Sequence, residues 1–502
     1  MKRTVSIVLL LAMLAGLVSC GAETEKPSDT TPPDTQNAVT DTSPQETEGE
    51  PDKGPSVAEI LPKKDFDGAT VQIIMDPAGD YIPSDEITGS AINDAIIDRT
   101  RAVEELYSVD LEYFTQQGME PREQYVMWAE AGDDTYKLYT SRTRYAGEYI
   151  TFGVARSWSK YPDIIDFDAE WFNTYAIETF AIGDDVRQLY GDANESGIRF
   201  AWIWLFNKEL AEQYHIPDLY ALVDEGKWTM DCLMSLTQNV YTDADGNGER
   251  NGEDVYGYVS DNTACYDSWG PTLGVSPVRK DENNLPYVVD AISERTAEGF
   301  EKLYKLLYES AGTYIYKDSP LGQTEDVFAR SGAIFTNTRI NLLENDTVRN
   351  MVDFGVLPTP KLTEDQDTYY THTDCMFTCL LLPSAISEED ALRSVYIANA
   401  LNAFGREMVL PVYYETVLKT RLTRDRESPR MMDLVLAGRR YGFEYFAESA
   451  FPLTHVTVLR NSYNAKRSPS VSAYTSQIDR CRKWISNFVD DWEDMVYWEG
   501  KN

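Results

Sequence analysis

A strand, helix and strand pattern is the feature that most constrains how this chain folds. Val71 to Met75 is a β-branched and apolar run that follows the turn Asp67-Gly68. Ser90 then precedes a segment whose apolar residues recur at helical spacing, and Val109 begins a second run of alternating apolar residues. Two strands joined through a helix usually lie parallel in one sheet. The sequence therefore predicts a parallel α/β architecture.

Local patterns predict further helices and strands along the chain. A polar helix is expected to begin within residues 206–214, and Thr229 is expected to cap a later helix. Short apolar runs at 332–337 and 353–358 predict buried strands. An amphipathic stripe in segment 471–492 consists of Ile478, Cys481, Ile485, Phe488 and Trp492. This stripe predicts a C-terminal helix that packs against the core.

The N-terminal segment predicts export and a tether. Lys2 and Arg3 precede an apolar run that is too short to span a bilayer, which is typical of a secretory signal at residues 1–19. The small residue before Cys20 resembles the lipobox of bacterial lipoproteins, which implies lipidation of Cys20. An ordinary signal with an incidental cysteine is the alternative. Residues 20–57 contain no aromatic residue and predict a disordered tether. We therefore expect a lipid-anchored protein at the extracellular face of the cell membrane.

Length, charge and cysteine content exclude several classes of protein. With 502 residues, the chain can build a large core and two or three domains. Its formal net charge of −38 disfavours binding to nucleic acid or to anionic lipid head groups, so the lipid anchor is the one membrane contact we expect. Six cysteines less Cys20 leave five, an odd number with no CxxC pair. This pattern predicts neither a disulfide framework nor a zinc site.

Several segments together resemble one known family. They read "FNKELAEQYHIPDLYALVDEGKWTMD", "VYGY", "VDFGVLPTPKL" and "LPVYYETVLKTRLTRDRESPRMMDLV". They are similar to the extracellular solute-binding proteins of carbohydrate-importing ABC transporters, in their lipoprotein form. The resemblance implies a two-lobed periplasmic-binding-protein-like fold of type II with an interlobe hinge. It places lobe 1 at 58–195 and 359–404, and lobe 2 at 196–358 and 405–502.

The resemblance implies a monomer that captures a saccharide in the interlobe cleft and delivers it to the permease subunits of an ABC importer. Ligands of open α/β sheets bind beyond the carboxyl ends of the strands, and sugars need aromatic faces with polar groups beside them. The family often has an Asp-aliphatic strand where this chain has residues 136–142, so first-lobe contacts are not carried over. Candidate ligand-binding residues are Asp76, Asp80, Tyr81, Ser141, Arg142, Trp202, Asp261, Tyr266, Trp269, Asn337, Arg339, His372 and Asp374. A buried structural hydrogen bond is the alternative for each of them.

The segment "YTDADGNGERNGEDVYGY" has the spacing of a calcium-binding loop. The expected ligands at loop positions 1, 3, 5, 7, 9 and 12 are Asp243, Asp245, Asn247, Glu249 (through its carbonyl), Asn251 and Asp254. Gly248 occupies position 6, where the sharp turn requires glycine. A solvated turn is the alternative, since Asp-Gly and Asn-Gly are common turn formers. A strand-like segment follows the loop, so we expect structural Ca²⁺ rather than a calcium sensor.

Two rival functions differ in class from an importer's binding protein. A secreted or surface polysaccharide-active enzyme would also be acidic and aromatic, and its two carboxylates leave no spacing to detect. No HExxH or GxSxG motif is present, and the three histidines lack metal-ligand spacing. A surface sensor that binds a ligand without transporting it is the second rival. We expect a binding protein and not an enzyme.

Overall fold

The computed structural model describes most of the chain after residue 55. The described residues are 56–81, 83, 90–316, 323–344, 352–419, 426–447, 450–452, 454, 456–469 and 471–499. Residues 55–502 form one compact unit. The expected signal, nearly all of the tether and Cys20 lie outside the described residues. No helix within the described ranges is both long and apolar enough to cross a membrane.

The first sheet contains the strand, helix and strand unit expected from the sequence. Its strand order is β2-β1-β3-β14-β4. The strands are β1 (Ala69–Met75), β2 (Val109–Thr115), β3 (Leu138–Arg142), β4 (Ala155–Arg156) and β14 (Thr378–Pro383). Strand β1 is parallel to both β2 and β3, with Val71 opposite Leu111. Helix α2 (Ala91–Tyr107) begins directly after Ser90 and joins β1 to β2, which confirms the prediction.

The second sheet has the strand order β10-β7-β11-β5-β12, with β6 beside β7. Its strands are β5 (Trp202–Asn207), β6 (Tyr241–Thr242), β7 (Val255–Asp261), β10 (Thr313–Tyr316), β11 (Ala333–Arg339) and β12 (Phe354–Leu357). Strand β7 is parallel to β10 and β11, whereas β5 is antiparallel to β11 and β12. Strands β11 and β12 confirm the two predicted buried strands. Both sheets are mixed rather than purely parallel, because β14 and β5 run against their neighbours.

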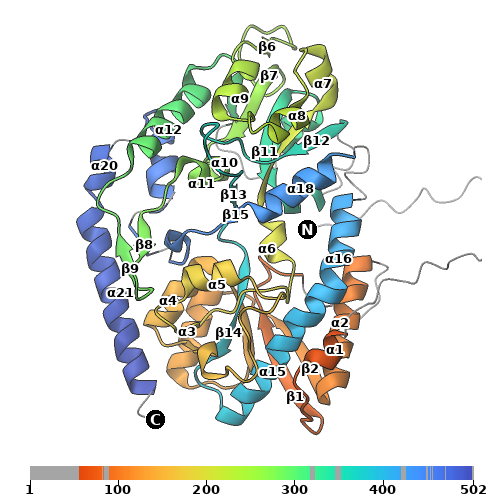
Figure 1. The fold of residues 1–502 in the computed structure, drawn as a ribbon, viewed down its shortest axis with the longest axis vertical. Coiled ribbons are helices and arrows are strands. Elements are labelled where there is room, and N and C mark those ends of the chain that lie inside the picture. The colour runs from red at the N-terminus through yellow and green to blue at the C-terminus, as the bar shows by residue number, and fades with distance from the viewer. Residues whose placement is uncertain are drawn as a thin grey trace, which may run out of the picture. The chain divides into compact units, whose positions relative to one another are not determined.

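Helices cover the faces of both sheets (Figure 1). Beside the first sheet are α1 (Val57–Ile60), α3 (Pro121–Ala131), α4 (Ala146–Thr151), α5 (Thr174–Phe180) and α15 (Glu388–Phe404), of which α15 packs against α2. The segment between the sheets contains α6 (Ser196–Arg199). With the second sheet are α7 (Lys208–Gln213), α8 (Leu219–Asp224), α9 (Met230–Thr237), α10 (Ala264–Asp267), α11 (Gly270–Leu273), α12 (Glu294–Tyr304) and α13 (Gln323–Ala329). The predicted cap of α9 is confirmed, since Thr229 Oγ1 accepts a hydrogen bond from the Cys232 N–H at 3.2 Å.

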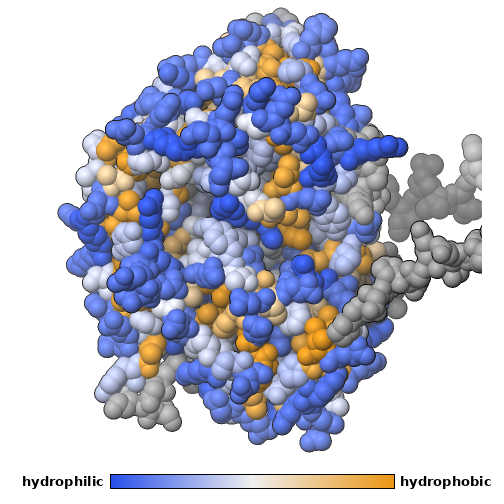
Figure 2. Space-filling model, in the orientation of Figure 1, coloured by the Kyte–Doolittle hydropathy of each residue, from blue (hydrophilic) through white to orange (hydrophobic). Residues whose placement is uncertain are grey.

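The core of the second sheet forms around its central strands. Every residue of β5 and of β11 is buried. Strand β5 is apolar from Trp202 to Phe206, as a strand covered on both faces requires, whereas β11 is apolar only from Ala333 to Phe335 and continues with buried polar residues. The face drawn in Figure 2 is covered largely by hydrophilic side chains, with apolar ones gathered in small separate areas.

The C-terminal part of the chain packs on both sheets' helices and on a small hairpin. Helices here are α16 (Leu410–Tyr413), α18 (Ser428–Ala437), α19 (Asn461–Asn464), α20 (Val471–Thr475) and α21 (Ile478–Glu499); the hairpin strands are β8 (Val278–Lys280) and β9 (Pro286–Val288). Helix α21 packs against α4 and β9 (Figure 1). Four residues of the predicted stripe are buried and Trp492 is half-buried. Helix α16 packs on α2, although we expected residues from 405 onward in lobe 2, whereas α18 packs on β12. The lobe boundaries stay a prediction.

Candidate functional site

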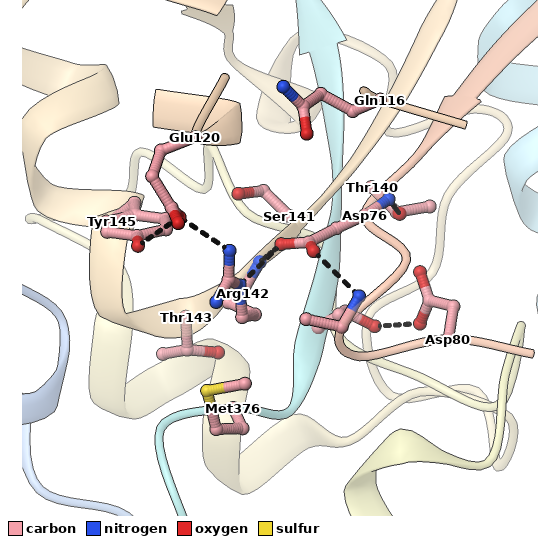
Figure 3. Close-up of polar contacts among 12 residues, drawn as sticks. Asp76, Asp80, Gln116, Glu120, Thr140, Ser141, Arg142, Thr143, Tyr145 and Met376 are labelled. Atoms are coloured by element: carbon pink, nitrogen blue, oxygen red, sulfur yellow. Dashed lines mark hydrogen bonds and ion pairs between the residues drawn. The ribbon is translucent and has the colours of Figure 1, made fainter. Parts of the chain in front are cut away.

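Polar residues at the carboxyl ends of β1 and β3 form an ion-pair cluster (Figure 3). Arg142 Nε donates to Asp76 Oδ2 at 2.7 Å, and Arg142 Nη2 donates to Glu120 Oε2 at 2.9 Å. Tyr145 donates its hydroxyl to the same Glu120 oxygen, and this bond together with the Arg142 charge lowers the pKa of Glu120. The structure thus brings together two residues predicted from sequence, Asp76 and Arg142. The Arg142 charge is already shared by two protein carboxylates.

Asp80 lies close to this cluster but has a different environment. Its side chain is buried, and Oδ1 accepts a hydrogen bond from Thr378 Oγ1. Oδ2 has no hydrogen-bond partner among the described residues. Burial raises the pKa of Asp80 from 3.8 to about 7, and burial also raises the pKa of the neighbouring Glu195. Asp80 is therefore partly protonated near neutral pH.

The Asp80→Asn variant should gain stability relative to the wild type as the pH rises. The unfolded chain loses the Asp80 proton near pH 3.8, whereas the folded chain keeps it up to about pH 7. The folded state therefore binds more protons in this window, so the wild-type free energy of unfolding falls as pH rises. The amide does not titrate. Urea unfolding should show a shift of at least about 1 kcal/mol in favour of the variant between about pH 4 and about pH 8. A difference that is constant over this range would contradict the assignment.

Tyr81 belongs to a hydrogen-bond network around Glu344 that links elements of the two sheets. Its hydroxyl donates to Glu344 Oε2 at 2.7 Å, and Arg199 Nε donates to Glu344 Oε1 at 3.0 Å. Tyr413 donates to Glu344 Oε1 at 2.8 Å. Glu344 ends the 3-10 helix η4 (Ile340–Glu344) after β11, whereas Tyr81 follows β1. Sequence analysis missed this hydrogen-bond network, because Arg199 and Glu344 are 145 residues apart and neither is part of a motif.

Three polar candidates, Asn337 and Asp261 of the second sheet and Ser141 of the first, form hydrogen bonds inside the protein. Asn337 is fully buried, donates to Ser268 Oγ at 2.8 Å and accepts from the Tyr258 hydroxyl at 2.8 Å. Asp261 and Ser141 are also buried with intramolecular hydrogen bonds. These residues show the structural hydrogen bond that was the alternative for each candidate. Their role toward a ligand stays a prediction.

Three of the aromatic candidates, Trp202, Tyr266 and Trp269, lie in packed surroundings. Trp202, Tyr266 and Trp269 are 1%, 0% and 0% exposed. The Trp269 ring centroid lies 5.2 Å from that of Trp204, and the Tyr266 hydroxyl lies 2.9 Å from that of Tyr308. None of the three presents a free ring face in this structure. We therefore assign them a packing role here, while a contact with ligand stays a prediction.

The last group of candidates leads to a cavity. Arg339 Nη1 pairs with Asp374 Oδ2 at 3.4 Å. His372 lies in β13 (Thr371–His372), which pairs in parallel with β15 (Arg439–Arg440). The His372 ring centroid is 4.9 Å from that of Tyr445, one of the residues that line the cavity.

We call this cavity the tyrosine pocket. It has a volume of about 160 Å³ and is lined by Tyr175, Gly270, Pro271, Gly274, Val275, Ser276, Tyr370, Arg440, Tyr441, Gly442, Glu444 and Tyr445. The lining comes from α5 beside the first sheet, from α11 with the loop after it, and from the segment after β15. None of the sequence candidates lines it. The aromatic and charged segment "RRYGFEY" (439–445) was the signal that sequence analysis missed.

The expected calcium loop lies between β6 and β7. One side-chain oxygen each of Asp243, Asp245 and Asp254 lie within 4.8 Å of one another. Asp254 is fully buried, and its Oδ1 accepts from the Ala244 N–H at 3.1 Å. The Gly248 N–H donates to Asp243 Oδ2 at 3.0 Å, with a φ of +75° that favours glycine. The carboxylates thus converge, and this all-oxygen donor set suits a hard cation.

Comparison with known proteins identifies the fold. No protein-family model matches the sequence, and no curated protein matches it. A solved structure of the ABC substrate-binding protein Lmo0181 from Listeria monocytogenes, in complex with cycloalternan, is similar at a TM-score of 0.52 and 14% identity, over 84% of this chain and 100% of that chain. A sugar transporter protein from Rhizobium etli in an open conformation gives a TM-score of 0.54 and 13% identity, over 82% and 99%. A cyclo/maltodextrin-binding protein complexed with maltotetraose gives 0.53 and 13%, over 86% and 97%. The chain has the two-lobed periplasmic-binding-protein fold that the sequence predicted.

Proposed function

We propose that this protein captures a saccharide between its lobes and delivers it to the permease subunits of an ABC importer. The observation that carries the proposal is the tyrosine pocket, whose lining comes from elements beside both sheets. Its tyrosines offer apolar ring faces and hydroxyl groups together, and Arg440 and Glu444 add polar groups at its wall. Fold neighbours crystallised with cycloalternan or maltotetraose support a saccharide as the ligand.

We propose binding without chemistry. Glycoside hydrolysis uses two carboxyl groups on opposite sides of the scissile bond. Among the described residues that line the tyrosine pocket, Glu444 is the single carboxylate. The similar structures are those of binding and transport proteins. Slow or absent turnover of bound glycans by the purified protein is therefore expected, and turnover at an enzyme-like rate would contradict the proposal.

Tyr175→Ala should weaken saccharide binding by about 1 to 3 kcal/mol, by analogy with aromatic stacking on nucleobases. Tyr175 lines the tyrosine pocket and is 45% exposed, so its ring is accessible to a ligand. Tyr287 is a matched control, because it is also 45% exposed but lies on the β8–β9 hairpin outside the pocket. A thermal-shift screen of mono- and oligosaccharides, followed by calorimetry with each ligand found, measures the effect. Equal losses of saccharide affinity in the Tyr175→Ala and Tyr287→Ala variants would contradict the placement of the binding site at the tyrosine pocket. A screen in which no saccharide binds would contradict the proposed function.

Binding should also favour a more compact state. A ligand that contacts both lobes shifts the equilibrium between open and closed forms by its differential affinity for them. Small-angle scattering at saturating saccharide checks this proposal through the radius of gyration, which should decrease.

We further propose the anchoring and the bound ion. Lipidation of Cys20 would hold the protein as a monomer at the extracellular face of the membrane; the small residue before Cys20 and the tether composition support this. Mass spectrometry of the native protein tests the lipid. We also propose that the loop from Asp243 to Asp254 holds Ca²⁺ as a structural clip, supported by the convergence of three carboxylates beside the edge of the second sheet.

A further inference from the structure

We infer that the tyrosine pocket selects saccharides that carry a carboxylate, such as those with uronic acid units, and that Arg440 binds that carboxylate. This inference rests on the proposed function and adds the chemical class of the ligand. It starts from the charge state of the pocket wall, where Arg440 forms no ion pair with a carboxylate of the described residues and Asp367 acts on it only at longer range.

Arg440 differs from three other arginines of the protein in having no carboxylate partner among the described residues. Arg339 is paired with Asp374 and Arg460 with Asp267, and Arg142 is paired with two carboxylates. Arg440 Nη1 instead donates to the Arg439 carbonyl at 2.9 Å, and no carboxylate of the described residues lies within 4.0 Å of its guanidinium. Arg439 and Arg250 likewise donate to backbone carbonyls, but neither of them lines the tyrosine pocket.

Two carboxylates on neighbouring segments, those of Asp367 and Glu444, form no ion pair with Arg440. The Tyr370 hydroxyl donates to Asp367 Oδ1 at 2.6 Å. Glu444 is 2% exposed, and its carboxylate lies over Gly442, where a Cβ would meet Glu444 Oε1 at 2.3 Å. A side chain at position 442 would therefore collide with this carboxylate. Glycine at this position allows the Glu444 carboxylate to fold back on its own backbone.

Aromatic rings hold the guanidinium in place. Arg440 Cζ lies 4.6 Å from the Tyr370 ring centroid and 5.8 Å from the Tyr175 ring centroid. Contacts of this kind stabilise the charge of a guanidinium without neutralising it. Arg440 uses Nη1 in a hydrogen bond within the protein, and the fork of N–H groups on a guanidinium matches the two oxygens of a carboxylate. Tyr175 and Tyr370 thus present Arg440 to the space in which a ligand binds.

The energetics of closure favour an acidic ligand over a neutral one. When the lobes close over a ligand, Arg440 loses water, and a buried charge without a partner costs free energy. Hydroxyl groups of a neutral sugar can accept hydrogen bonds from Arg440 but leave its charge uncompensated. A ligand carboxylate supplies both the acceptors and the opposite charge. The net charge of −38 repels an anion at long range, but salt screens this repulsion beyond about 8 Å, so the local charge determines selectivity.

Calorimetry with matched ligands tests the inference. The probes are uronic acid oligosaccharides and their methyl esters, which have nearly the same size but no charge, together with a panel of neutral saccharides. The full mature protein should bind the acid form at least about tenfold more tightly than its ester. Arg440→Gln should lower affinity for the acid at least about tenfold and remove the preference, while neutral saccharides bind about as before. Arg440→Lys should retain part of the preference, and Arg480→Gln, at an exposed position on α21, should change nothing.

The outcomes separate this inference from the proposed function. Equal or tighter binding of the ester, or of neutral saccharides alone, would overturn the selectivity and leave saccharide capture intact. An acid preference that persists in a folded Arg440→Gln protein would remove Arg440 from the explanation. Absence of binding to every acidic and neutral saccharide would overturn both. Melting curves of each variant show whether a loss of affinity comes from unfolding.

Discussion

Replacing Arg142 with methionine should lower the free energy of unfolding by about 3 to 5 kcal/mol. Asp76 is fully buried, and the Arg142 guanidinium 2.7 Å away supplies the positive charge that compensates it. Removal of this charge leaves a buried carboxylate without its ion-pair partner, and methionine keeps much of the packing volume. Urea unfolding measures the loss. The Arg142→Met variant should also unfold at a clearly lower temperature.

Two controls separate the buried charge from general damage. The Asp76→Asn/Arg142→Met double variant should lose less stability than Arg142→Met alone, because no uncompensated charge remains. Arg101 forms an exposed ion pair with Asp98, and the two side chains are 58% and 59% exposed, respectively. Arg101→Met removes this pair and should change the free energy of unfolding by less than about 1 kcal/mol. If Arg142→Met and Arg101→Met lower the free energy of unfolding by equal amounts, the ion pair of Asp76 and Arg142 does not stabilise the first lobe.

Arg142 and Arg440 show why the residue type alone does not identify a ligand contact. Sequence analysis selected Arg142, which ends β3, whereas it did not select Arg440, which lines the tyrosine pocket. The structure assigns the Arg142 charge to Asp76 and Glu120. Arg440 has tyrosine rings and a backbone carbonyl as its neighbours. Pairing depends on contacts between distant segments, so the chain order does not reveal which charge is free.

Elements defined by local periodicity could be predicted from the sequence. Helix α2 begins directly after Ser90, and α9 begins at the cap provided by Thr229. The parallel pairing of β1 with β2 was also predicted, from the strand, helix and strand pattern. These features depend on residues close in sequence or on a common fold rule. The mixed direction of the strands was not accessible, since it depends on where the chain crosses between the sheets.

The tyrosine pocket could not be predicted, because four separate segments form it. Tyr175, the loop 270–276, Tyr370 and the segment 440–445 meet only in the folded protein. Trp269 looked equally suitable as a sugar platform, yet it packs against Trp204 in the core. A tryptophan near a strand end has the same local pattern whether it is a core residue or a binding platform. Burial distinguishes the two roles, and burial is a property of the whole fold.

Removing calcium should lower the melting temperature if the loop from Asp243 to Asp254 holds the ion as proposed. Calcium that binds the folded chain and hardly binds the unfolded one adds about 2.7 kcal/mol of stability at 100 times its dissociation constant. For a folded unit of this length, that corresponds to a shift of about 3 °C. A chelator should lower the melting temperature, calcium should restore it, and magnesium should do so poorly, because Mg²⁺ requires a tighter octahedral shell. Differential scanning calorimetry measures all three.

Variants of two acidic turns test the assignment of the ion to this loop. Asp243→Ala should abolish the response to calcium, because Asp243 provides the first of the three converging carboxylates. Asp281 is the matched control: it lies in the exposed turn of the β8–β9 hairpin, and its Oδ1 accepts from the Asn283 and Leu285 N–H groups at 2.9 Å. Asp281→Ala should keep the full response.

Saccharide affinity should stay unchanged in chelated protein that is still folded, because none of the loop residues lines the tyrosine pocket. A melting curve indifferent to the chelator would leave the loop as a solvated turn, and loss of saccharide binding in the folded, chelated protein would place the ion at the ligand site instead.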